Sequence, residues 1–204
     1  MYHIKNDKRA VKSAELIYKG LSDLIEKKSF DAITITDIQK ASGVGRATFY
    51  RSFDTVNDVL YWKCALHYRE VMTGYLEERN RLNKKEDPYA FMTYFFSYWM
   101  RDENSKILEQ LIKIGHYDII YRCHFESTFI IKNKVPPKSA LTEKYYTYYM
   151  SGLIGAFVGF LITWIENGKA LSTEELIAVL KSVQGEDASS LFLVLHEKLG
   201  SNKK

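Results

Sequence analysis

The stretch RATFYR carries side chains that can bind a nucleic acid. Arg46 can donate two hydrogen bonds to the edge of a guanine or one to a phosphate, and Thr48 can bond a base or a phosphate. Ala47 is small enough for close approach to a thymine methyl group. Tyr50 can donate its hydroxyl group to a phosphate, and Arg51 belongs to the same stretch. These side chains can act together only if a rigid element presents them on one surface.

The flanking sequence predicts such an element, a helix-turn-helix. Residues 36–42 form a short helix, residues 43–45 a tight turn and residues 46–52 a second helix. Gly43 supplies the positive φ that a sharp turn between helices needs. A second helix of this kind fits the major groove of DNA, where side chains near its N-terminal end reach base edges.

The apolar and capping residues of this segment agree with the same structure. Ile38, Val44 and Phe49 are spaced so that they can be buried together and fix the crossing angle. Thr36 is the expected N-cap of the first helix, and the N–H groups behind it suit a phosphate. Gly45 can cap the second helix. The alternative is a helical hairpin inside a bundle, which does not account for a surface rich in Arg, Thr and Tyr.

A longer segment that contains this motif resembles a known family. Residues 34–62, TITDIQKASGVGRATFYRSFDTVNDVLYW, resemble the N-terminal motif of the TetR family of transcriptional regulators, and the resemblance extends over about residues 8–62. Residues 148–180 are similar to the C-terminal part of a subgroup that includes dihydroxyacetone kinase regulators. The resemblance implies a homodimer that binds double-stranded DNA and an unknown small-molecule effector. The surface expected to contact DNA comprises Thr36, Gly45, Arg46, Ala47, Thr48, Tyr50 and Arg51.

The sequence departs from the family pattern at three positions. Gln39 stands where the family often has Ala, Gly45 where it often has Ser, and Val56 where a Lys is common. The last two changes remove possible contacts to the DNA backbone. These contacts are then expected from basic residues of the first helix: Lys8, Arg9 and Lys12.

The rest of the chain has the periodicity of helices. Among 204 residues, 46% are hydrophobic, 26% are charged and only three are prolines, so long helices are allowed almost throughout. We predict an all-α fold of about nine or ten helices, the last at residues 187–199, with loops at residues 83–88 and 134–139. Thr55 and Ser172 are the expected N-caps of two of these helices, Ser172 in a capping box with Glu175, and Asn167-Gly168 is an expected C-terminal signal. A helix-turn-helix DNA-binding domain is expected at residues 1–55, and a helical effector-binding and dimerisation domain at residues 56–204. The charge of +4 permits an acidic partner without requiring one.

One stretch raises the question of a membrane. Residues 145–165 carry no charge and are long enough to cross a bilayer, and Gly155 and Gly159 have the spacing of paired membrane helices. Their N-terminal third, YYTYYMSG, is however more polar than a typical span. A helix that is apolar all round can also lie in the core of a soluble assembly.

The family resemblance implies that this helix pairs with its copy in a second subunit. Small residues then let the two backbones come close, while a stripe of large residues packs on its own subunit. The row expected at the dimer interface is Ser151, Gly155, Gly159 and Ile162. A membrane anchor and a core helix without dimerisation are the alternatives. Two-fold symmetry would place two recognition helices about 34–36 Å apart, which predicts a palindromic or near-palindromic site.

The resemblance also implies a small-molecule pocket in the larger domain. Aromatic walls with a few polar tips would suit a planar or cationic ligand. Candidate lining residues are Trp62, Tyr94, Tyr98, Trp99, His116, Tyr117, Tyr121 and Phe125. The alternative is that these aromatic residues form plain core.

Residues with other chemistry show no recognisable arrangement. The sequence has no nucleophile elbow or phosphate loop, and His67, His116, His124 and His196 have no metal-binding spacing. We therefore expect no catalytic residues, no metal and no cofactor. Cys64 and Cys123 are expected to be reduced thiols, and the charged N-terminus lacks the apolar core of a signal peptide.

The sequence as a whole predicts a cytoplasmic homodimeric transcription factor, a repressor that a small molecule releases from its operator. An activator, or a regulator controlled by a partner protein, is the alternative in the same class. An enzyme that retains a DNA-binding head is the alternative in another class.

Overall fold

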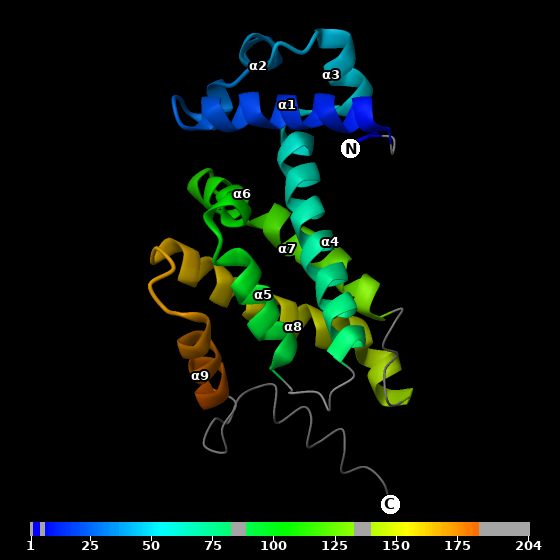
Figure 1. The fold of residues 1–204 in the computed structure, drawn as a ribbon, viewed down its shortest axis with the longest axis vertical. Coiled ribbons are helices and arrows are strands. Elements are labelled where there is room, and N and C mark those ends of the chain that lie inside the picture. The colour runs from blue at the N-terminus through cyan, green and yellow to red at the C-terminus, as the bar shows by residue number, and fades with distance from the viewer. Residues whose placement is uncertain (1, 5–6, 83–88, 133–139, 184–204) are drawn as a thin grey trace, which may run out of the picture. The chain divides into compact units, whose positions relative to one another are not determined.

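The computed structural model describes residues 2–4, 7–82, 89–132 and 140–183 (Figure 1). Within these ranges the regular elements are helices, and the only β-type pairing is an isolated bridge between Tyr2 and Phe53. The predicted all-α class is confirmed. The predicted helix at residues 187–199 lies outside the described residues, as do the loops predicted at residues 83–88 and 134–139.

Nine α-helices and one short 3-10 helix make up the described part of the chain. They are α1 (Lys8–Ile25), the 3-10 helix η1 (Phe30–Ala32), α2 (Ile35–Ser42), α3 (Arg46–Ser52), α4 (Val56–Leu82), α5 (Ala90–Trp99), α6 (Asp102–Lys113), α7 (Tyr117–Lys132), α8 (Ala140–Glu166) and α9 (Thr173–Val183).

The chain divides into two compact units. The first unit contains the residues up to His67 together with Lys106–Cys123. The second unit contains Tyr68–Ser105 and the described residues from His124 onwards. The predicted domain boundary after residue 55 stays a prediction.

In the first unit, α1 is the support for the two short helices α2 and α3, which lie along one side of it in Figure 1. Its apolar face is fully buried at Ala14, Ile17 and Leu21, and Asp7 caps its N-terminus by accepting from the N–H of Arg9. Gly20 allows close packing against the end of α2, because a Cβ there would lie 2.9 Å from the backbone nitrogen of Ser42.

The N-terminus of α2 differs from the prediction. The N-cap is Thr34, not Thr36, and it forms a capping box with Asp37. The Thr34 hydroxyl oxygen accepts from the N–H of Asp37 at 3.2 Å, and the Asp37 carboxylate accepts from the N–H of Thr34 at 2.9 Å. Thr36 failed as the cap because the acidic partner stands three residues after Thr34 and only one residue after Thr36. Thr36 lies exposed in the first turn.

We expect Thr34→Ala to lower the free energy of unfolding by about 1 kcal/mol, the usual cost of losing an N-cap hydroxyl. Thr36→Ala is the matched control, because it removes a threonine hydroxyl close to the same helix end without removing the cap. Its effect on the free energy of unfolding should stay within about 0.5 kcal/mol. Urea unfolding of both variants measures the difference. A greater loss for Thr36→Ala would contradict the assignment.

A buried polar group links α1 to α6 inside the first unit. The hydroxyl of Tyr18 donates to Oε1 of Gln110 at 3.2 Å, and Nε2 of Gln110 donates to Oγ of Ser22 at 2.8 Å. All three residues are less than one-tenth exposed. Because buried polar groups are costly when left unpaired, this network fixes the register of α6 against α1.

The second unit has an aromatic core. Phe95 and Phe96 of α5 pack on Phe157 of α8 with centroid distances of 4.8 and 5.4 Å, and Phe96 also contacts Trp164. Such edge-to-face and tilted pairs are favourable geometries for aromatic rings. The predicted end of α8 is confirmed, since Gly168 follows the helix with a φ of 66°.

The predicted capping residues of two further helices are also confirmed. Thr55 and Asp58 form reciprocal side-chain-to-backbone bonds at the start of α4. Ser172 and Glu175 do the same at the start of α9.

Candidate nucleic-acid interface and effector region

The turn between α2 and α3 depends on the conformation of one glycine. Gly43 has a φ of 69°, in the left-handed region, and its N–H donates to the carbonyl of Gln39 at 2.9 Å. A Cβ at Gly43 would meet nothing within 4 Å, so backbone strain and not crowding favours glycine there. The N–H of Val44 then donates to Oγ of Ser42. These contacts confirm the predicted tight turn.

The inner side of α3 is anchored by aromatic packing. Phe49 and Phe53 are 1% and 0% exposed, their centroids lie 5.9 Å apart, and Phe53 meets Trp62 of α4 edge-on at 5.8 Å. Ile38 of α2 is fully buried and Val44 is half-buried, as their spacing predicts. Since cores of this kind are close-packed, α3 has one fixed orientation on its own unit.

The N-terminal residues hold the other end of α3, which the sequence did not predict. The N–H of His3 donates to the carbonyl of Ser52 at 2.8 Å, and the His3 ring lies 3.1 Å from the carboxylate of Asp54. Tyr2 completes an isolated antiparallel bridge with Phe53. Residues this close to a chain end carry no periodic signal, so only the fold reveals their contact with α3.

The outer side of α3 presents the predicted side chains to solvent. Arg46, Ala47, Tyr50 and Arg51 are exposed, and Thr48 is partly exposed. The side chains are therefore available to a ligand on one surface. Their contact with DNA stays a prediction.

Arg46 and Tyr50 form a pair along this surface. They lie one helical turn apart, with the guanidinium carbon 5.5 Å from the ring centroid and Nη2 3.4 Å from the hydroxyl oxygen. A guanidinium group has five N–H donors, so this single long contact leaves others for an acceptor. The contact with Tyr50 therefore positions the guanidinium group of Arg46 and leaves N–H donors available.

The remaining predicted contacts surround α3. Gly45 precedes it as an exposed N-cap without a side-chain bond, and Thr36 is exposed on α2. The neighbouring Asp37 keeps its charge, because hydrogen bonds from Lys28 and Thr34 hold the pKa of its carboxyl well below the usual range. Lys28 lies 2.6 Å away and offsets that charge.

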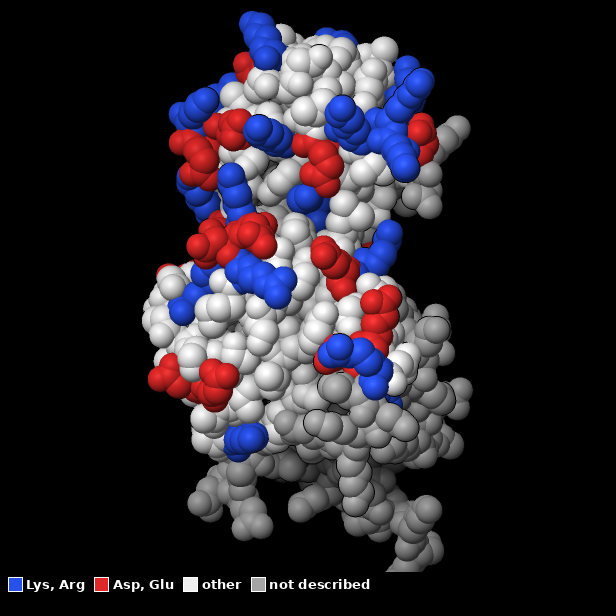
Figure 2. Space-filling view, in the orientation of Figure 1, with Lys and Arg blue, Asp and Glu red and all other residues white. Residues whose placement is uncertain are grey.

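Basic side chains are spread over the surface of α1, α2 and α3, with acidic ones among them (Figure 2). Lys8, Arg9 and Lys12, the predicted alternative backbone contacts, are all exposed on the first turns of α1. This distribution suits contacts to phosphates at several points around α3.

A family model decides what kind of protein carries this surface. Residues 17–60 match the model of bacterial regulatory proteins, tetR family. This part of the chain is a helix-turn-helix domain of the tetR type. The matched residues run from the middle of α1 through the turn to the start of α4, so they include the whole helix-turn-helix.

Solved structures share the fold of this protein along most of the chain. Lin0861 from Listeria innocua is 15% identical, with 89% of this chain and 94% of that chain covered and a TM-score of 0.66. The dihydroxyacetone kinase operon activator DhaS is 17% identical, with 84% and 96% covered and a TM-score of 0.50. No curated protein matches the sequence. Identities this low establish a common fold alone.

The eight residues predicted to bind an effector are divided between the two units. Trp62, His116, Tyr117 and Tyr121 belong to the first unit, and Tyr94, Tyr98, Trp99 and Phe125 to the second. Their roles as pocket residues stay a prediction.

Four of these residues have the surroundings of an ordinary core or surface. Trp62 is 3% exposed under α3, and the ring of His116 packs on Phe30 at 5.3 Å. Tyr117 is 42% exposed. Tyr98 is buried and its hydroxyl donates to Glu70 at 2.9 Å.

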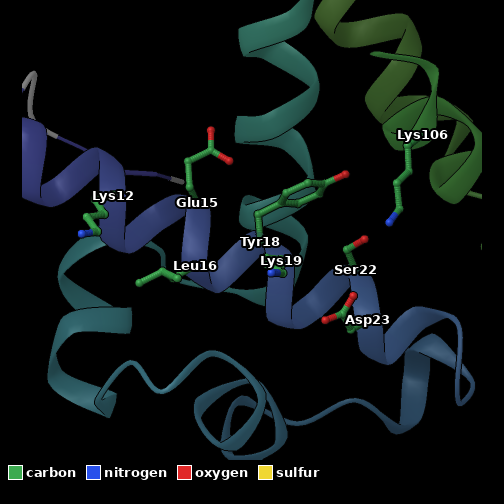
Figure 3. A pocket seen from close by; sticks show the side chains of 8 residues that line it. All are labelled: Lys12, Glu15, Leu16, Tyr18, Lys19, Ser22, Asp23 and Lys106. Atoms are coloured by element: carbon green, nitrogen blue, oxygen red, sulfur yellow. The ribbon is translucent and has the colours of Figure 1, made fainter. Parts of the chain in front are cut away.

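A pocket of about 400 Å³ lies on α1 in the first unit (Figure 3). Its lining consists of Lys12, Glu15, Leu16, Tyr18, Lys19, Ser22, Asp23 and Lys106, which differ from the predicted effector residues. In Figure 3, Lys106 points from α6 toward the part of α1 that carries Ser22. Tyr18 and Ser22 are already bonded to Gln110, and Glu15 is paired with Lys63 at 2.9 Å. Three polar residues of the lining are therefore already paired within the first unit.

Two of the four residues in the predicted interface row on α8 are exposed. Gly155 and Gly159 are exposed, and a Cβ at either would meet nothing within 4 Å. Ser151 and Ile162 are half-buried. The other side of α8 is buried at Phe157, Leu161 and Trp164, among others. The helix thus has one face in its own core, and its two glycines of the predicted row lie exposed.

Among the described residues, none of the helices is both long enough and apolar enough to cross a membrane.

His124 is a residue of interest that its sequence context did not distinguish. It lies on α7 in the second unit, is 4% exposed, and burial lowers its pKa to about 3. Its Nδ1 is buried without a hydrogen-bond partner among the described residues. The sequence could not indicate this burial, because a single histidine on a helix has the same sequence context whether it is exposed or buried.

We expect His124 to make the free energy of unfolding of the protein fall in mild acid. The unfolded chain binds a proton at His124 below a pKa of 6.5, whereas the folded chain binds it only near 3. Stability is therefore full above 6.5 and falls by about 1.4 kcal/mol for each pH unit below it. Urea unfolding at pH 7, 6 and 5 measures this slope.

The variant His124→Phe isolates the contribution of this residue, because phenylalanine cannot take up the proton. The difference in unfolding free energy between the variant and the native protein should then grow in the variant's favour as the pH falls. A difference that is constant from pH 7 to 5 would contradict the buried neutral histidine.

Proposed function

We propose that this regulator is a cytoplasmic repressor that binds a near-palindromic operator as a homodimer and is released by a small molecule. The observation that carries the proposal is the exposed side of α3, where Arg46, Ala47, Thr48, Tyr50 and Arg51 are presented by a helix fixed on a buried aromatic anchor. Base reading needs this combination, since bidentate contacts demand a rigid support.

Dimerisation is supported by the open face of α8. Glycines within a helix cost stability, so an exposed pair is best explained by close approach of another backbone. Ser151 and Ile162 extend the row above and below Gly155 and Gly159. A second copy of α8 crossing at these residues would bury the row of both chains, as a two-fold interface requires.

The dimer determines the form of the operator. Two copies of α3 related by a two-fold axis would enter successive major grooves about 34–36 Å apart on one side of the duplex. Each half-site would be read by one Arg46, with phosphates contacted by Tyr50, Thr36 and the basic start of α1. The affinity would fall steeply with salt, because phosphate contacts release counterions.

Release by a small molecule needs only a difference in affinity between two arrangements of the dimer. A ligand that binds the arrangement with mismatched recognition helices would shift the population away from DNA. Release is then a shift of the equilibrium from the DNA-bound dimer to the ligand-bound dimer, and no catalytic step is required.

The test uses the DNA upstream of the regulator's own gene. Fluorescence anisotropy should show saturable binding to a duplex that contains an inverted repeat from this region, and much weaker binding to a shuffled duplex of the same composition. Equal binding to both duplexes would reject the proposal.

A reporter gene behind the same region decides the sign of regulation. Lower expression in the presence of the regulator is expected for a repressor. Higher expression would favour activation, the role stated in the name of the similar structure DhaS.

A further inference from the structure

The last turn of α3 is held by two residues from the start of the chain, Tyr2 and His3, which we call the N-terminal strap. The N–H of His3 donates to the carbonyl of Ser52 at 2.8 Å, and Tyr2 forms an antiparallel bridge with Phe53. The last carbonyl groups of a helix have no partner within the helix. Ser52 is the last residue of α3 and is 4% exposed. The strap therefore satisfies a buried carbonyl at the end of the helix.

The short helix α3 depends on such contacts for its shape. It spans only seven residues, and its N-cap, Gly45, makes no side-chain bond. Helices of this length are unstable in water by themselves, so tertiary contacts must hold them. Phe49 and Phe53 bury the inner side of α3, and the strap holds its C-terminal end. Without the strap we expect the last turn to fray, as weakly held helix ends do.

The turn that the strap holds carries two of the side chains proposed to contact DNA. Tyr50 and Arg51 directly precede Ser52. The hydroxyl oxygen of Tyr50 also accepts from Nη2 of Arg46 at 3.4 Å. The last turn thus influences the guanidinium group that is expected to read a base. Bidentate contacts to a base edge need accurate placement, so fraying of this turn would weaken base reading more than general attraction to DNA.

The strap in turn rests on α4 and α7. The ring of Tyr2 packs on the ring of Tyr61 in α4 with a centroid distance of 5.7 Å. The guanidinium carbon of Arg122 in α7 lies 4.4 Å from the centroid of the same Tyr61 ring, which is a cation–π contact. Beside Arg122, Sγ of Cys123 lies 3.8 Å from the carbonyl oxygen of Tyr61. α7 therefore contacts α4 at the residue that supports the strap.

We infer that Tyr2 and His3 are positioning residues for operator binding, and that Arg122 of α7 holds them in place through the ring of Tyr61. The strap fixes the last turn of α3, and Tyr61 and Arg122 fix the strap. All four residues belong to the first unit. The inference rests on the proposed function and adds the residues that set the geometry of the reading helix. A shift of α7 against α4 would change the support of the strap and, with it, the last turn of α3.

The first test removes the hydrogen bond of the strap with His3→Pro, because proline has no backbone N–H. Tyr2 can keep its extended backbone, since a residue before proline favours that conformation. The preference for the operator over a shuffled duplex should fall about tenfold, because each copy of α3 loses one hydrogen bond. His3→Ala is the matched control. It keeps the N–H and loses only the exposed ring pair with Asp54, so its preference should change less than about twofold.

Amide hydrogen exchange of the free protein separates positioning from a general loss of stability. The N–H of Phe53 donates to the carbonyl of Phe49 at 2.8 Å and therefore reports on the last turn of α3. In His3→Pro this amide should exchange about tenfold faster, while the amide of Leu21 in the core of α1 should keep its native rate. Native operator preference in a folded His3→Pro would overturn the inference. Equal acceleration at Phe53 and Leu21 would overturn it as well.

Arg122→Ala tests the far end of the same contacts and remains informative should His3→Pro fail to fold. Arg122 is exposed, so the variant should fold. Exchange at Phe53 should be about threefold faster and the operator preference about threefold lower, the size of one exposed cation–π contact. Arg122→Lys keeps a cation over the ring and should recover most of both effects. Arg69→Ala removes the same charge from an exposed position of α4 and should change neither. Native exchange and native preference in Arg122→Ala would overturn the inference.

The native protein in the same titrations separates this inference from the proposed function. A native protein without preference for the operator would reject the proposed function and the inference with it. A native protein that prefers the operator, together with variants that keep its full preference, would reject the inference alone.

Discussion

Arg46→Ala is expected to abolish sequence-specific DNA binding and to leave a folded dimer. The side chain is exposed and its guanidinium group contacts Tyr50, one turn away on the same helix, so the core anchored by Phe49 stays intact. A bidentate contact to a base contributes about 1–3 kcal/mol of discrimination. Since a dimer reads two half-sites, the preference for the operator over a shuffled duplex should fall by about 2–6 kcal/mol.

The measurement is a titration of both duplexes by fluorescence anisotropy at two salt concentrations. Arg69→Ala is the matched control, because Arg69 is an exposed arginine of α4 and its removal changes the net charge equally. The control should lose little specificity. If Arg46→Ala keeps its full preference for the operator, Arg46 does not read bases, even where the total affinity of the variant for DNA is lower.

Gly159→Arg is expected to convert the dimer into folded monomers. A side chain at Gly159 enters open space in the subunit, so the subunit should fold. In the dimer the same side chain would stand between two backbones and bring two positive charges together at the two-fold axis. Because a monomer contacts a single half-site, operator affinity should fall by at least about a hundredfold, or roughly 3 kcal/mol.

Sedimentation equilibrium measures the oligomeric state, and the anisotropy titration measures the consequence for DNA. Val179→Arg is the control, since Val179 is an exposed apolar residue of α9 in the same unit. That variant should remain dimeric. A dimeric Gly159→Arg protein with native operator affinity would show that the face of α8 has another role.

The parts of the fold that sequence could predict are those fixed by local signals. Gly43 needs a left-handed backbone wherever it stands, and the spacing of Ile38, Val44 and Phe49 repeats the helical period. Local rules also predicted the caps of α4 and α9. The same rules placed the N-cap of α2 at Thr36, two residues after the true cap, Thr34. Both threonines are suitable N-caps, and only Thr34 has Asp37 three residues after it.

The parts that sequence could not predict depend on contacts between distant segments. The support of α3 by Tyr2 and His3 joins residues about fifty positions apart. Aromatic spacing could not show which rings belong to the same compact unit, and the predicted effector residues fall in two units. The pairing state of the His124 ring is likewise set by three other helices, and no periodicity reports it.

The proposed function depends above all on base reading by the exposed side of α3. In a symmetric dimer, each of the two copies of α3 would read one half-site. The most direct measurement is selection of bound duplexes from a random-sequence pool by the purified full-length protein, followed by sequencing. We expect an enriched inverted repeat whose half-sites are centred about one helical turn apart, and loss of that enrichment with Arg46→Ala. A pool that stays random, or an enriched motif that Arg46→Ala retains unchanged, would contradict base reading by α3.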